Sequence, residues 1–176
     1  MTQPVGGRRA RLIKNSVYTL IQEGMDELGW FDTGRQHKPV KLIPERKEWN
    51  DEILPNLVTV TEEDIDEHSM ELGSNLTEFW WEMMVDVYAE NSAVGLDLAT
   101  DIRDLLSGRF TTVSSVGPNI DVYDLANLGA TPVPLFTVEI ENVSMGRVRR
   151  DAPKPYQKYW WVVFFRVVDA YADEEY

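Results

Sequence analysis

The chain has 176 residues, no cysteine and a formal net charge of −13. This length supports one hydrophobic core and predicts a single domain over residues 1–176. The absence of cysteine excludes disulfides, thiolate metal sites and cysteine nucleophiles. Residues 1–50 carry nine Lys or Arg and six Asp or Glu, whereas residues 51–176 carry eight and 24. Such an acidic body repels the phosphate backbone, which disfavours general binding to nucleic acid.

Contact with a membrane is not expected either. No apolar run approaches the roughly 18 residues that a membrane-spanning helix needs. Residues 1–9 also lack the apolar core of a signal peptide. We therefore expect a soluble protein that is made in a cytoplasm.

The first predicted element is an amphipathic helix from about residue 8 to residue 28. Apolar side chains recur along it at helical spacing, and Gly29 supplies a stop. The first turns of this helix are basic, and their charge opposes the helix dipole. A solvated or partner-facing helix end would explain this arrangement, and chance explains it equally well. These basic residues are Arg8, Arg9, Arg11 and Lys14.

Residues 31–56 lose this periodicity and gain prolines and mixed charges, which predicts a long loop. Residues 40–43 offer a short extended segment within it. Loops of this length inside a domain are usually functional, so we expect a contact segment or one that becomes ordered on assembly.

Two strands and a helix are predicted next. Residues 57–61 alternate as a short strand, and the acidic residues 62–71 predict a solvated helix start or a charged turn after it. A second helix is predicted from Ser92, as its N-cap, to about Ser107. Between them, residues 77–89 give the clearest half-buried strand, with an apolar face made of Phe79, Trp81, Met83, Val85 and Val87.

Residues 109–134 form a second Gly- and Pro-punctuated passage, in which residues 120–123 are candidates for a short strand. Residues 135–148 resume a strand-like alternation, and its phase slips near Asn142, which indicates a β-bulge. A basic turn then leads into the final strand.

This final strand, residues 159–171, is apolar on both faces, and a short acidic tail at residues 172–176 follows it. A strand with water on one side does not show this pattern. Helices can cover one face, and the other face needs a second layer or another subunit, which points to an assembly protein. Trp160, Val162, Phe164 and Val168 point one way, and Tyr159, Trp161, Val163, Phe165 and Val167 point the other.

The order of elements is therefore helix, strand, strand, helix, strand, strand. It predicts an α+β fold, a two-layer sandwich in which a mainly antiparallel four-stranded sheet packs both helices on one face.

The sequence offers little chemistry for catalysis. Neither His37 nor His68 has a second metal ligand at a recognised spacing, and the acidic residues 62–67 lack the pattern of an EF-hand. Neither a phosphate-binding glycine loop nor a nucleophile elbow occurs. We therefore predict no catalytic residue, no cofactor and no metal site. Scattered Asp, His and Arg that converge in space leave a small acidic enzyme or ligand-binding domain open.

Two tryptophan pairs suit packing better than ligand binding. No basic residue is interleaved with them, so a stacking platform for single-stranded nucleic acid is not favoured. Because neighbours on a strand point to opposite faces, one Trp of each pair faces the core and the other suits a subunit contact. The pairs are Trp80 with Trp81 and Trp160 with Trp161.

Three segments, together with the order of elements, resemble the tail terminator (tail-completion) proteins of long-tailed bacteriophages. They are the strand at residues 78–90, the helix ending at residues 99–108, and the hairpin from Phe136 to Arg166. The first basic helix and the long loop after it also suit that family. The similarity covers most of residues 8–172 and is one of pattern and order.

This resemblance implies a virion protein of the tail and neck region. It implies a homo-oligomer, a hexameric ring, that sits on the head-proximal end of the tail tube, stops tube polymerisation and offers the surface to which the head docks. The implied partners are the tail tube protein and the head–tail connector, and DNA passes through the lumen without specific binding. The candidate contact residues for the ring or tube are Arg8, Arg9, Arg11, Trp80, Arg147, Arg149, Arg150, Lys154 and Trp160.

Two alternatives stay open. A head-closure or other neck adaptor shares small α+β designs with terminators, so the fold alone does not separate them. The other is the small acidic enzyme or ligand-binding domain, which a deep pocket with convergent polar groups would favour.

Overall fold

The computed structural model describes residues 6–33, 37–43, 56–69, 76–109, 119–124, 134–148 and 159–172. Within these ranges the side chains at positions 6–8, 63–69, 76–77 and 170–172 are left out of the description.

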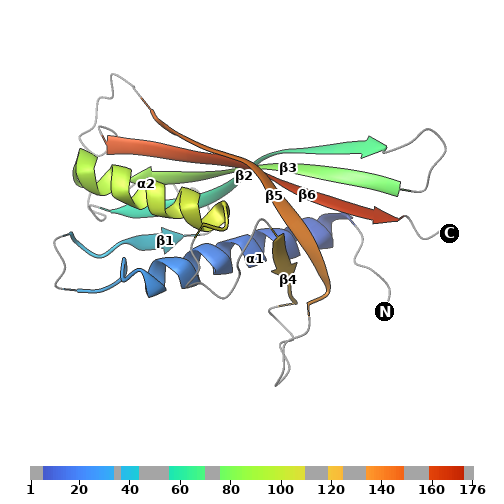
Figure 1. The fold of residues 1–176 in the computed structure, drawn as a ribbon, viewed down its shortest axis with the longest axis horizontal. Coiled ribbons are helices and arrows are strands. Elements are labelled where there is room, and N and C mark those ends of the chain that lie inside the picture. Colours follow the sequence, from blue (N-terminus) through green and yellow to red (C-terminus); the bar gives the residue numbers. More distant parts are fainter. Residues whose placement is uncertain are drawn as a thin grey trace.

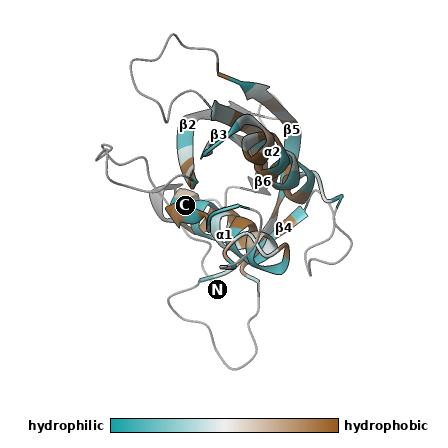
Figure 2. Ribbon diagram, turned by 90° about the vertical axis from the view of Figure 1, so that its left-hand side faces the viewer, coloured by the Kyte–Doolittle hydropathy of each residue, from teal (hydrophilic) through white to brown (hydrophobic). Residues whose placement is uncertain are grey.

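The described residues form two helices and one six-stranded sheet, shown in Figure 1. The strands lie in the order β1-β2-β3-β6-β5-β4, and only the pairing of β1 with β2 is parallel. The sheet is strongly curled into a half-barrel, as Figure 2 shows. The elements are α1 (Gly6–Glu27), β1 (Lys41–Ile43), β2 (Leu57–Ser69), β3 (Leu76–Tyr88), α2 (Ser92–Leu106), β4 (Asn119–Val122), β5 (Phe136–Arg147) and β6 (Trp160–Ala172).

The predicted sandwich of four antiparallel strands with two helices on one face is therefore wrong. Two further strands, β1 and β4, form the edges of the sheet, and β1 makes the sheet mixed. The sequence offered both segments only as short extended pieces and left them out of the sheet, whereas in the structure each pairs with a longer neighbouring strand. The curl follows from the right-handed twist of long strands and from the bulges in β2 and β5.

The solvated helix start or charged turn predicted at residues 62–71 is also wrong. Strand β2 continues to Ser69, and its pairing with β3 runs from Leu57 opposite Tyr88 to Ser69 opposite Thr77. Acidic residues are poor strand formers, but pairing along the full length of β3 overrides that preference. The register shifts between Glu62 and Asp64, which marks a bulge.

Helix α1 lies across the open side of the half-barrel, near β4 at one edge (Figure 2). The Tyr18 hydroxyl donates a hydrogen bond to the Leu42 carbonyl of β1, with an O···O distance of 3.2 Å. At the other edge, the backbone N–H of Tyr123, which follows β4, donates to the hydroxyl of Ser16 at 3.3 Å. These bonds tie α1 to both edges of the sheet.

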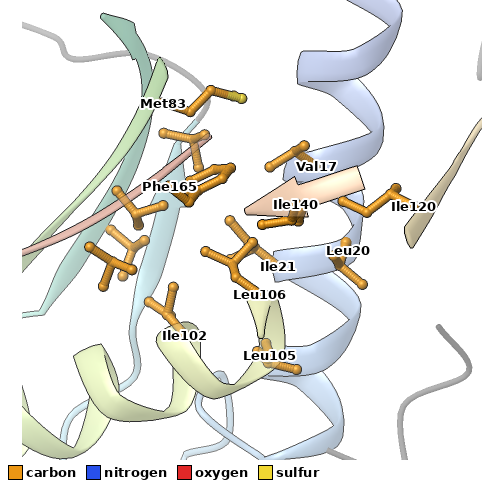
Figure 3. Packing of buried hydrophobic residues seen from close by; sticks show 14 of the residues in the cluster. Val17, Leu20, Ile21, Met83, Ile102, Leu105, Leu106, Ile120, Ile140 and Phe165 are labelled. Atoms are coloured by element: carbon orange, nitrogen blue, oxygen red, sulfur yellow. The ribbon is translucent and has the colours of Figure 1, made fainter. Parts of the chain in front are cut away.

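One large core fills the space between the concave face of the sheet and the two helices, and Figure 3 shows its centre. Full burial of each such aliphatic side chain stabilises the fold by about 1.5–3 kcal/mol. Every element except the short β1 contributes buried side chains, among them Val17 and Ile21 of α1, Val58 of β2, Met83 of β3, Ile102 and Leu106 of α2, Ile120 of β4, Ile140 of β5 and Phe165 of β6.

The helix ends agree closely with the sequence. Gly29 and Gly108 adopt left-handed backbone angles after the two helices, with φ of 74° and 66°, as expected of glycine stops. Ser92 is not the N-cap of α2. That position belongs to Asn91, whose Oδ1 accepts a hydrogen bond from the Val94 N–H at 2.9 Å.

Candidate intersubunit surface

The outer, convex face of the sheet carries a second apolar cluster, which we call the outer cluster. It covers the first half of β6, so that Val162 on the outer face and Val163 on the inner face are both buried. The prediction that both faces of the final strand are apolar and need cover is confirmed for these residues. The outer cluster consists of Leu57, Met84, Tyr88, Trp160 and Val162.

A buried carboxylate anchors the outer cluster. Asp86 is fully buried and accepts a hydrogen bond from the Trp160 indole N–H at 2.7 Å, and the Thr59 hydroxyl lies at 3.5 Å from it. The Trp160 ring in turn stacks on Tyr88, with 5.4 Å between ring centres. Trp160, a candidate contact residue, is thus packed inside the subunit.

The outer face of β6 becomes open after Val162. Phe164 is 48% exposed, although it lies on a central strand of the sheet. Beside it, the Arg166 guanidinium lies 4.3 Å from the centre of the Trp80 ring and donates a hydrogen bond from Nη2 to the Glu82 carboxylate at 2.8 Å. We call Trp80, Glu82, Phe164, Arg166 and half-buried Val168 the outer patch.

A shallow cavity of about 300 Å³ opens on the outer patch. Its polar lining comes from Glu82, Arg166 and Asn142, and Phe164 forms one apolar wall. Asn142 sits at the bulge of β5 with a φ of 54°, as the predicted slip in phase near this residue requires. An aromatic ring beside a paired charge suits a protein contact, since Trp, Phe and Arg are enriched in interfaces.

Carboxylates surround the outer patch. The register of the sheet places Arg166 between Glu82 of β3 and Glu141 of β5. Because side chains alternate along a strand, the acidic neighbours of inward-facing core residues point outward. The described outward-facing carboxylates, which we call the acidic outer face, are Glu78, Glu82, Asp121, Glu139 and Glu141.

The basic start of α1 is divided between the inside and the outside of the subunit. Arg9 is buried: its Nε and Nη2 both donate to the carboxylate of Asp169 in β6, and its guanidinium lies 3.6 Å from the centre of the Phe136 ring. Arg11 is exposed, and Lys14 pairs with Glu62 of β2 at 3.7 Å.

The other candidate contact residues lie as follows. Arg147 is exposed at the end of β5, and Trp80 belongs to the outer patch. Arg8 belongs to α1, but its side chain lies outside the described part of the chain, as do Arg149, Arg150 and Lys154 with the basic turn. The structure thus brings Trp80 into the outer patch, keeps Arg9 and Trp160 inside the subunit, and leaves Arg11 and Arg147 on the surface.

Phe164, Arg166 and Glu82 were not among the candidate contacts. The two-residue period placed Phe164 on the same face of the final strand as Val162, but it does not predict which of the two is exposed. Only the structure separates them, since one is 2% exposed and the other 48%.

One further carboxylate has a perturbed pKa. Asp101 of α2 accepts a hydrogen bond from the Trp30 indole N–H at 2.8 Å. Burial raises the pKa of Asp101, the bond from Trp30 lowers it, and the nearby charges of Asp97 and Asp104 raise it again. The group holds Trp30 against α2, and this arrangement is structural.

No further chemistry converges in the part of the chain that the structure describes. No three potential metal ligands lie together there, and neither described helix is both long and apolar enough to cross a membrane. Compared with known proteins, the chain matches no protein-family model and no curated protein.

Proposed function

We propose that this protein is a structural protein of a bacteriophage virion. It forms a ring at the head-proximal end of the tail tube, ends tube polymerisation and provides the surface on which the head docks. The resemblance in element order and strand pattern suggests this role. The observation that carries it is the open outer face of β6 at Phe164, on a strand whose neighbouring residues Val162, Val163 and Phe165 are buried.

A half-exposed phenylalanine on a central strand leaves apolar surface in contact with water when the subunit is alone. Complete burial of such a ring stabilises an interface by about 1.5–3 kcal/mol, and roughly half of that is still available at Phe164. The neighbouring Trp80 and the Arg166–Glu82 pair form a mixed rim around it. These properties support a surface that a protein partner covers.

A ring also requires two unlike faces on each subunit, since head-to-tail contacts close only when one surface fits a different one. The open outer face of the sheet and the α1 side of the half-barrel are such a pair. The net charge of −13 further suits a channel for DNA, because an acidic ring lets the phosphate backbone pass without adhering.

An enzymatic role receives less support. The described lining of the cavity on the outer patch pairs Glu82 with Arg166 and offers neither a nucleophile nor a histidine. Catalysis by general acid and base needs groups within hydrogen-bond reach of a substrate in a sheltered site. The outer patch is better suited to contact than to reaction.

The test removes the exposed ring and observes tails. A phage lacking this gene is complemented with the wild-type chain, with Phe164→Ser, or with Leu96→Ser as a control at another exposed apolar residue, 40% exposed on α2. We expect overlong tails without the gene and with the Phe164 variant, and tails of normal length with the control. Tails of normal length that lack heads would instead indicate a neck adaptor, and normal virions without the gene would overturn the proposal.

A further inference from the structure

The acidic outer face needs a cationic partner. In the described residues it contains five carboxylates, and Arg166, which lies opposite Glu82 and Glu141, already donates a hydrogen bond to Glu82. Like charges on neighbouring strands of one face repel each other, so a cation from a partner would stabilise this face. Glu139 and Glu141 are both exposed and stand on the same strand.

The start of α1 carries charge of the opposite sign to the acidic outer face. Its first turn carries no acidic residue, so its positive charge opposes the helix dipole. Arg9 finds its counter-charge inside the subunit, and Lys14 finds one in Glu62. The exposed Arg11 points away from the core, and its charge is available to an acidic partner.

These two surfaces lie at the same end of the sheet and face opposite ways. The Arg9–Asp169 pair fixes the beginning of α1 at the end of β6, and Figure 1 shows α1 starting at the end of the molecule where β6 finishes. Arg166 and Val168 occupy that same half of β6 but point outward, whereas α1 packs on the concave side.

We infer that a second copy of this chain docks the basic start of its α1 onto the acidic outer face, with Phe164 and Trp80 at the centre of the contact. This inference rests on the proposed ring and names the contact that closes it. The two surfaces are unlike and lie on opposite sides of the subunit, as a head-to-tail contact between identical copies requires. Charge pairs at its rim steer the approach, and the aromatic rings provide burial.

Charge reversal tests the contact in solution with the full chain. We expect Arg11→Glu alone, and Glu139→Lys with Glu141→Lys, each to weaken self-association about tenfold or more in sedimentation at low salt. An equimolar mixture of the two variants should associate again, because each retains one native face and their altered charges are complementary. Arg109→Glu, at an exposed residue beyond α2, and Glu23→Lys, at an exposed residue of α1, are matched controls and should behave as wild type.

Cross-linking gives a second readout that does not depend on a strong complex. The chain contains no cysteine, so Asn15→Cys and Ser144→Cys place single thiols one turn beyond Arg11 and beside Phe164. A short bis-maleimide should join these two variants to each other more readily than it joins either variant to itself or to Arg109→Cys.

The inference is overturned by reversed variants that associate like wild type, or by a wild-type chain that stays monomeric at low salt and gives no preferred cross-link. The acidic face would then meet the lumen or another protein. If phage lacking the gene make tails of normal length, the proposed function is wrong, but the proposed contact between copies can still be correct. If the gene deletion gives overlong tails but the charge-reversed variants self-associate like wild type, only the proposed contact is wrong.

Discussion

The buried ion pair between Arg9 and Asp169 gives the sharpest test of how this subunit is held together. Arg9 is 3% exposed and Asp169 is 1% exposed, and two hydrogen bonds join them. Replacing Arg9 with Met keeps most of the apolar stem but leaves a buried carboxylate without its cation. Breaking a buried pair in this way costs about 3–5 kcal/mol.

The same reasoning gives a different result when both partners change. In a variant with Arg9→Met and Asp169→Leu no buried charge remains, so the loss of stability should be well below the sum of the two single losses. The Phe136 ring loses its guanidinium in either case, because Arg9 lies 3.6 Å from its centre. That stacking loss, about 1–2 kcal/mol, opposes whatever stability the double variant gains from no longer burying two charges.

Urea unfolding of the wild type, the two single variants and the double variant provides the assay. A single variant that loses less than about 1 kcal/mol, or a double variant whose loss equals the sum, would refute the reasoning, because surface pairs behave in that way.

Three smaller effects follow from other contacts. Asp101→Asn keeps an acceptor for the indole N–H and removes a carboxylate whose raised pKa costs stability, so we expect a gain of roughly 0.5 kcal/mol at neutral pH after allowing for solvent screening. That gain in stability should vanish below the ordinary carboxyl pKa, where Asp101 is protonated in both the folded and the unfolded protein. It should develop as the pH rises from the ordinary pKa through the raised pKa of the folded protein. Thermal melts across this pH range check it. Asn91→Ala removes the N-cap of α2 and should cost about 1 kcal/mol in urea unfolding, whereas Ser92→Ala should be near neutral. Trp160→Phe deprives buried Asp86 of a donor and should cost about 1–3 kcal/mol, and a smaller loss in chemical denaturation would mean that the bond is replaced.

The parts of the fold that depend on local pattern could be predicted from the sequence. Gly29 ends the first helix, the inward face of β3 is as expected, and the bulge falls at Asn142. Those features depend on neighbours three or four positions away at most. The sequence marked residues 40–43 and 120–123 only as short extended segments, and their places at the two edges of the sheet depend on pairing with β2 and β5.

In the candidate site, too, some features could be predicted from the local sequence pattern and others depend on the complete fold. The alternating pattern predicted that the outer face of the final strand is apolar, and this is correct for Trp160, Val162 and Phe164. It gave no sign that the first two are covered and the third is open, because that depends on how the sheet curls. Arg9 was grouped with Arg11 as a surface cation, yet its partner, Asp169, is 160 residues away in the chain.

The pairing of Arg9 with Asp169 also shapes how the polypeptide reaches its folded state. A ribosome makes Arg9 160 residues before Asp169, so helix α1 has no anchor while those residues are added. Joining segments so distant in sequence carries a large loop-closure entropy and slows folding. Completion of the half-barrel is thus postponed until the last strand has left the exit tunnel, and a truncated nascent chain lacks the strand that carries Phe164.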